Sequence, residues 1–149
     1  MLILIKENVS ENDLPILVEE IFWIANLYRI WCFKGNLGSG KTTFIKHLCK
    51  LLGIENVSSP SFSLINSYFS SIVGEVLHFD FYRINTLDEA IDLGTEEFLL
   101  SGNLCLLEWA EKIKTFLPER FVEIEISLCN LTHRNYKVYL YGGKNENGS

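Results

Sequence analysis

The strongest chemical signal in the sequence is a glycine-rich segment followed directly by a lysine and a threonine. Residues 35–42 read Gly-Asn-Leu-Gly-Ser-Gly-Lys-Thr, which completes the G-x-x-x-x-G-K-[ST] pattern of a phosphate-binding loop. Glycines let such a loop curl so that its backbone N–H groups point at phosphate oxygens. Lys41 would reach the β- and γ-phosphates, Thr42 would offer its hydroxyl to Mg²⁺, and Thr43 could contact the α-phosphate. The simpler interpretation, a glycine turn with a solvated lysine, is disfavoured by the strand and helix expected on either side.

Two carboxylates end apolar segments elsewhere in the chain. Glu108 follows Leu-Cys-Leu-Leu, and Asp80 follows Val-Leu-His-Phe. A phosphate-binding loop requires an acid that holds the metal or its water, usually at the end of a neighbouring apolar strand. Either acid alone could be a surface residue at a strand end. We assign Glu108 to Mg²⁺, directly or through water, and Asp80 to orienting metal-bound or attacking water. The predicted catalytic residues are therefore Asp80, Glu108 and Lys41.

The segment from His78 to Arg83 is unusually polar for a strand. It carries a histidine, an acid, a tyrosine and an arginine within six residues, and His78, Asp80 and Tyr82 share one face if the strand persists. A lone histidine is more often a hydrogen-bonded structural residue than a ligand, so the role of His78 stays open. Arg83 either pairs with an acid such as Glu97 or Asp80, or supplies positive charge to the reaction from within the chain.

Two further groups lie close in sequence to these residues. Ser58-Ser59-Pro60-Ser61-Phe62 follows the helix after the glycine loop, where a switch segment could approach the γ-phosphate. From the pentapeptide alone, an ordinary Ser-Pro turn is the favoured interpretation. Trp109 directly follows Glu108, so its ring belongs either to the core or to the nucleotide side of the acid.

The elements that position these residues follow from apolar periodicity and from glycine and serine breaks. We expect a helix from Ser10 as N-cap to about Asn26, a second helix that begins after the glycine loop and stops near Gly53, and short helices at 86–93 and 95–100. Strands are expected at 2–6, 29–34, 62–69, 75–82, 104–107, 121–128 and 135–141. This order predicts an α/β fold, a single P-loop NTPase domain with three layers and a mixed, partly parallel sheet with an antiparallel portion. The domain covers residues 1–141, and residues 142–149 form a polar tail.

Composition excludes several other classes of protein. The chain has 149 residues, 48% hydrophobic, and a formal charge of −6 from 13 basic and 19 acidic residues, which argues for one folded domain and against a surface built chiefly for nucleic acid. The four cysteines form no C-x-x-C pair, so we expect reduced thiols rather than zinc or disulfides. The opening run Met1–Ile5 is too short for a signal peptide or a membrane span, which favours a cytoplasmic protein without a membrane partner.

With these residues in place, the chain resembles the TsaE (YjeE) family, bacterial P-loop ATPases of tRNA threonylcarbamoyladenosine synthesis. The resemblance rests on G-N-L-G-S-G-K-T-T-F at 35–44, V-S-S-P-S-F-S-L at 57–64, H-F-D-F-Y-R at 78–83 and L-L-E-W-A-E at 106–111. It implies ATP and Mg²⁺ as cofactors and a Mg-dependent ATPase that is weak alone. It also implies that the chain supports TsaD and TsaB in forming the threonylcarbamoyl group at adenosine 37 of ANN-decoding tRNAs. Contact with tRNA would be indirect.

The resemblance also assigns site residues one by one. Thr42 and Glu108 would hold the metal, Asp80 would belong to the catalytic site, and Ser59, Pro60 and Ser61 would form a switch-like loop. The nucleotide-binding residues would be Glu11, Leu37, Gly38, Ser39, Gly40, Lys41, Thr42, Thr43, Trp109 and Arg134. Two positions depart from the family pattern, Ser61 for threonine and Ala110 for proline, and neither removes a catalytic group.

Other classes of function make different demands on the sequence. A small-molecule P-loop kinase is the main alternative, but it usually needs a lid with several arginines, and no arginine-rich segment is present. A GTPase is disfavoured because the chain lacks an N-K-x-D segment. A binding module that keeps nucleotide as a structural ligand is the third possibility.

Overall fold

The computed structural model describes residues 1–57 and 64–143, and they form one mixed sheet. In that part of the chain the sheet has seven strands in the order β1-β7-β6-β2-β5-β4-β3. Strands β6, β2, β5 and β4 run parallel to one another, whereas β1, β7 and β3 join by antiparallel pairing. The strands are β1 (Leu2–Ser10), β2 (Ile30–Lys34), β3 (Ile65–Ser70), β4 (Gly74–Asp80), β5 (Leu104–Glu108), β6 (Phe121–Leu128) and β7 (His133–Tyr141). The prediction of a partly parallel sheet with an antiparallel portion is confirmed.

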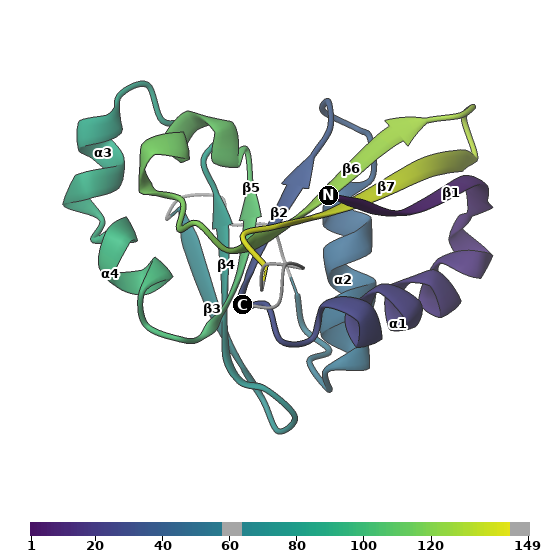
Figure 1. Cartoon of the computed structure of the whole chain (residues 1–149), viewed down its shortest axis with the longest axis horizontal. Helices are drawn as coiled ribbons and strands as arrows, with labels where there is room; N and C mark the ends of the chain where they lie inside the picture. Colours follow the sequence, from purple (N-terminus) through teal and green to yellow (C-terminus); the bar gives the residue numbers. More distant parts are fainter. Residues whose placement is uncertain (58–63, 144–149) are drawn as a thin grey trace.

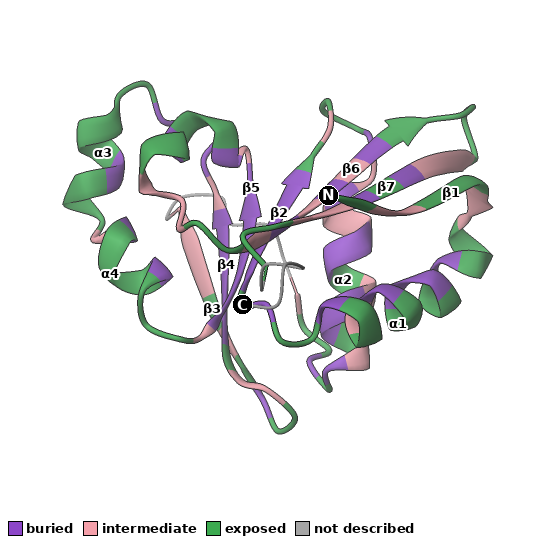
Figure 2. Ribbon diagram, viewed as in Figure 1, coloured by how far each residue is buried: buried purple, intermediate pink, exposed green. Residues whose placement is uncertain are grey.

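Helices cover both faces of this sheet and make a three-layer domain (Figure 1). The longer helices α1 (Leu14–Ala25) and α2 (Lys41–Leu51) pack on one face, and one hydrophobic cluster joins them to the sheet. The other face carries the short helices α3 (Leu87–Asp92) and α4 (Thr95–Leu99) together with the 3-10 segment η2 (Ala110–Phe116). Strands β2 and β5 lie between these layers, so their residues are almost continuously buried (Figure 2), as expected for parallel strands covered on both faces.

The first helix begins later than the sequence predicts. Ser10 is not its N-cap, because β1 continues through Val9 and Ser10, which pair with β7. The chain then turns through the 3-10 segment η1 (Glu11–Asp13), and α1 starts at Leu14 with proline in its first turn, where proline is favoured. The strand predicted at 2–6 is therefore shorter than β1. The last residues of β1 are fixed by pairing with β7, which lies more than a hundred residues away and leaves no local signal in the sequence.

The other predicted elements agree with their observed places within a few residues, whereas the 3-10 segment η2 is not predicted by the sequence. The expected pair of strands around 62–69 and 75–82 is an antiparallel hairpin of β3 and β4. Gly53 follows α2 with a φ of 81°, a left-handed conformation typical of the residue after a helix. The predicted serine-rich switch segment, including Ser59, Pro60 and Ser61, lies outside the described residues, and so does most of the predicted polar tail.

Candidate nucleotide and metal site

The glycine loop connects the buried strand β2 to the N-terminus of α2. Gly40 has a φ of 110°, which side-chain-bearing residues rarely adopt. At Gly35 an added Cβ would lie 2.5 Å from the backbone oxygen of Ile126, so the loop packs against β6 with no room for a side chain. Ser39 is 2% exposed, and within residues 1–57 and 64–143 its hydroxyl has no hydrogen-bond partner. The N-terminus of α2, which follows this loop, favours an anion.

Lys41 lies at the first position of α2 with its ammonium folded over the loop. Its Nζ donates to the carbonyl of Gly35 at 2.5 Å and sits 4.0 Å from the centre of the Trp109 ring. Burial lowers the pKa of Lys41, while the carboxylates of Glu108, Glu111 and Asp80 oppose that change. A partly desolvated ammonium of this kind interacts strongly with an incoming phosphate, because little water remains to screen the charge.

The two predicted acids meet at one edge of the sheet. Strands β4 and β5 are parallel and pair Asp80 with Glu108, and β5 adjoins the strand that leads into the glycine loop. The Thr42 hydroxyl donates to Glu108 Oε1 at 3.3 Å. On its other side, Glu108 Oε2 lies 2.7 Å from His78 Nε2. The pairing of β4 with β5 thus brings together two carboxylates and an imidazole, and the start of α2 adds the Thr42 hydroxyl to them.

Asp80 and Glu108 differ in their surroundings. Glu108 is 3% exposed, whereas Asp80 is half-buried and its Oδ1 accepts the Tyr82 N–H at 3.0 Å. Burial raises the pKa of Asp80, and the nearby negative charge of Glu108 acts in the same direction. Glu108 is buried and held by two hydrogen bonds, whereas Asp80 keeps access to water, so the two acids suit different tasks.

The donors at this edge fit a magnesium ion. A threonine hydroxyl beside a buried carboxylate supplies the hard oxygen ligands that Mg²⁺ takes, and phosphate and water usually complete its coordination. No group of three or more His, Cys, Asp or Glu side chains that could cage a metal occurs among the described residues. A threonine hydroxyl and one buried carboxylate would leave coordination positions of such an ion for phosphate and water.

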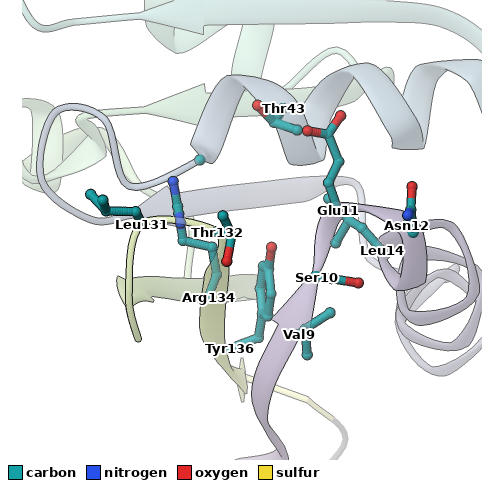
Figure 3. Close-up of a pocket in the computed structure, with 11 residues that line it drawn as sticks. Val9, Ser10, Glu11, Asn12, Leu14, Thr43, Leu131, Thr132, Arg134 and Tyr136 are labelled. Carbon is teal, nitrogen blue, oxygen red and sulfur yellow. The ribbon is translucent and has the colours of Figure 1, made fainter.

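A pocket of about 400 Å³ opens on one side of the glycine loop, between η1 and β7 (Figure 3). Glu11, Thr43 and Arg134 line it together with Tyr136. Arg134 Nε donates to the Ser39 carbonyl at 2.8 Å, which ties β7 to the glycine loop. Glu11 also lies 3.6 Å from His47 on α2. The structure therefore brings Glu11 and Arg134 to one cavity beside the loop, although 122 residues separate them in sequence.

Leu37 and Trp109 lie on the opposite side of the loop. Both line a second cavity of about 470 Å³, together with Glu111. Trp109 has a φ of 61°, an uncommon value for a bulky residue, and its ring packs against Tyr82 at 5.0 Å between centroids. The ring lies beside Lys41 and also packs against the hydrophobic cluster on that face of the sheet, so its role toward a nucleotide stays a prediction.

The contact between His78 and Glu108 does not follow from the sequence, which leaves the partner of His78 open. In the structure the imidazole lies against Glu108. The available signal was the spacing of two between His78 and Asp80, which puts both on one strand face. Glu111 was not proposed either, although it acts electrostatically on Lys41. Arg83 is exposed beyond β4, and its pairing with Glu97 or Asp80 stays a prediction.

Together the fold and the site define the class of protein to which the chain belongs. A glycine loop of complete pattern, placed between a central parallel strand and a helix with two acids at the same sheet edge, is the arrangement of a P-loop NTPase domain.

The chain belongs to the TsaE family: the family model described as "Threonylcarbamoyl adenosine biosynthesis protein TsaE" matches residues 9–136. A relative from Aquifex aeolicus, named tRNA threonylcarbamoyladenosine biosynthesis protein TsaE, is 37% identical over 141 residues, 91% of this chain and 97% of its own. One of the same name from Rickettsia bellii is 40% identical over 114 residues, 70% of this chain and 78% of its own. The crystal structure of Bacillus subtilis YdiB superposes with a TM-score of 0.72 at 27% identity, covering 95% of this chain and 88% of that one. Among the described residues, no helix is both long and apolar enough to cross a membrane.

Proposed function

We propose that this protein binds ATP with Mg²⁺ and hydrolyses it slowly, and that this activity supports a TsaB–TsaD complex during the formation of threonylcarbamoyladenosine at position 37 of ANN-decoding tRNAs. The observation that carries the proposal is the Thr42 hydroxyl, 3.3 Å from the buried Glu108 carboxylate at the head of a complete phosphate-binding loop. Family membership supports the tRNA-modification context, since the relatives carry that name.

Each residue has a distinct task in the proposed reaction. The loop from Leu37 to Thr43, including Gly38, Ser39 and Gly40, cradles the phosphates with backbone N–H groups, and Lys41 neutralises the β- and γ-phosphates. Thr42 and Glu108 would hold the metal, which would supply positive charge to stabilise the charge that develops on the phosphates. Asp80 orients the attacking water. The base end of the nucleotide lies on the Glu11 and Arg134 side, and Trp109 covers the loop from the other side.

The proposed partners would carry out the transfer step and the binding of tRNA. Transfer of the threonylcarbamoyl group would belong to TsaD, so this chain needs no tRNA surface, and its formal charge of −6 agrees. Hydrolysis by the chain alone is expected to be slow, because the group that stabilises the γ-phosphate charge is often contributed by a partner, worth about 10³ to 10⁵ in rate. The activity is proposed to take place in the cytoplasm.

The test is ATP hydrolysis by the purified protein, alone and with TsaB and TsaD added, with Lys41→Ala as the control. Stimulation by the pair that disappears in Lys41→Ala is the expected result. Phosphate transferred to an added metabolite, with no response to TsaB and TsaD, would instead indicate a small-molecule kinase. Nucleotide binding without hydrolysis under any of these conditions would leave only a nucleotide-binding module.

A further inference from the structure

His78 is a buried histidine that hydrogen-bonds one carboxylate oxygen of the site. It lies on β4 with 0% of its surface exposed, and its Nε2 is 2.7 Å from Glu108 Oε2. The other oxygen of Glu108 faces the Thr42 hydroxyl at 3.3 Å. The two oxygens of Glu108 therefore face different groups, one toward the interior of the sheet and one toward the glycine loop.

The strand register explains how His78 reaches this acid. In the pairing of β4 with β5, His78 lies opposite Leu106, and Asp80 lies opposite Glu108. His78 is therefore one step further into the sheet than the acids and on the same face as both of them. Val76, two residues earlier on that face, is part of the apolar core. An apolar side chain at position 78 would continue that core, so the polar imidazole is not needed for packing.

The hydrogen bonding of the imidazole identifies its role more closely. Buried polar groups normally find a partner, and His78 Nε2 finds Glu108. Within residues 1–57 and 64–143, His78 Nδ1 has no hydrogen-bond partner. An ionised carboxylate can only accept a hydrogen bond, so the contact with Glu108 uses a hydrogen on Nε2 of His78.

We propose that His78 is a positioning residue that holds Glu108 Oε2 and thereby aims Oε1 at Thr42, where the metal of the proposed function would bind. The last torsion of a glutamate is broad, so a carboxylate without such a donor samples many orientations. Groups that hydrogen-bond a metal-ligating side chain from outside typically change metal affinity by about 10- to 100-fold. This inference rests on the proposed function, because it assigns His78 to the metal end of that same site.

The test compares three substitutions at position 78 by the affinity of Mn²⁺, used as a paramagnetic substitute for Mg²⁺, for the protein saturated with ADP. His78→Leu removes the donor, and His78→Asn keeps polarity but is too short to reach Glu108. The side-chain amide of His78→Gln can place an N–H close to the position of Nε2. We expect Mn²⁺ affinity to fall about 10- to 100-fold in His78→Leu and His78→Asn and to recover largely in His78→Gln. Nucleotide affinity without metal should stay within about threefold, because Lys41 and the loop are unchanged.

Val76→Ala is the matched control. It lies on the same strand and face and is fully buried, so it lowers stability without touching Glu108. Wild-type Mn²⁺ affinity in His78→Asn and His78→Leu would overturn the inference, and so would an equal loss in Val76→Ala. Failure of His78→Gln to recover affinity above His78→Asn would also overturn it. If the wild-type protein with ADP binds no Mn²⁺, the proposed function itself fails, and that result is distinct from unchanged affinity among the variants.

Discussion

Replacing Arg134 with alanine tests whether β7 helps to hold the nucleotide. Arg134 Nε donates to the Ser39 carbonyl at 2.8 Å, and its Nη1 donates to the carbonyls of Asn130 and His133 at 3.2 and 3.1 Å. The first bond joins β7 to the glycine loop, and the other two hold the guanidinium in place. Hydrogen bonds from charged groups contribute about 1.5–3 kcal/mol. Because the side chain is only half-buried, we take the lower end of that range, which corresponds to about a tenfold loss of nucleotide affinity.

Calorimetric titration of Arg134→Ala with Mg-ADP and with inorganic tripolyphosphate measures this loss and locates its cause. If the bond to Ser39 acts by ordering the loop, both ligands should weaken about tenfold. A further loss with Mg-ADP alone would come from contact with the nucleoside end in the pocket of Figure 3.

Lys137→Ala is the matched control, because it removes the same charge from the same strand at an exposed position outside that pocket. Affinities of Arg134→Ala within twofold of wild type for both ligands would refute the reasoning, and so would an equal loss in Lys137→Ala.

Three further predictions concern the acids and the thiols. Glu108→Ala should reduce Mg²⁺-dependent hydrolysis much more than metal-free nucleotide affinity, and unchanged hydrolysis would move the metal role to Asp80. Burial raises the pKa of Asp80 in the folded state, so ionising Asp80 lowers the stability of the folded protein. The loss is complete above the folded-state pKa, and it is absent at a pH where Asp80 is protonated in both the folded and the unfolded protein. Asp80→Asn should therefore unfold at higher denaturant concentration than wild type at pH 8, and the difference should shrink as the pH falls toward about 4; a difference independent of pH would contradict this. Cys129 is exposed, whereas burial raises the pKa of Cys49 and of Cys105 to about 12 and raises the pKa of Cys32 as well. A thiol reagent at pH 8 should thus modify one cysteine quickly in the folded protein and four after unfolding; two or more fast thiols in the folded protein would show that the core opens.

The local features of this fold could be predicted because they depend on neighbours in sequence. The glycine loop, the helix after it and the buried strand that ends at Glu108 all follow from residue types over fewer than a dozen positions. Asp80 and Glu108 could be proposed as site acids for the same reason, since each ends an apolar run.

Features that depend on pairing across the sheet could not be predicted in this way. The register that sets Asp80 opposite Glu108 and brings His78 to the same carboxylate is a property of two strands together. The extension of β1 through Ser10 likewise depends on β7. Hydrophobic periodicity describes one strand at a time and contains no information on register. Glu11 and Arg134 were therefore reached only through the resemblance to a family.

The antiparallel pairing of β1 with β7 has a consequence for the order in which the site forms during synthesis. The loop, Lys41, Asp80 and Glu108 all belong to the first 108 residues. Strand β7, which carries Arg134 and pairs with the end of β1 just before Glu11, comes later. A chain emerging from the ribosome holds the complete phosphate-binding sequence before residue 134 has been added. Contacts between distant segments close last because their loop-closure entropy is largest. The nascent chain should therefore bind phosphate compounds weakly until β6 and β7 support the loop, and the contacts proposed for the nucleoside should form only when β7 joins β1.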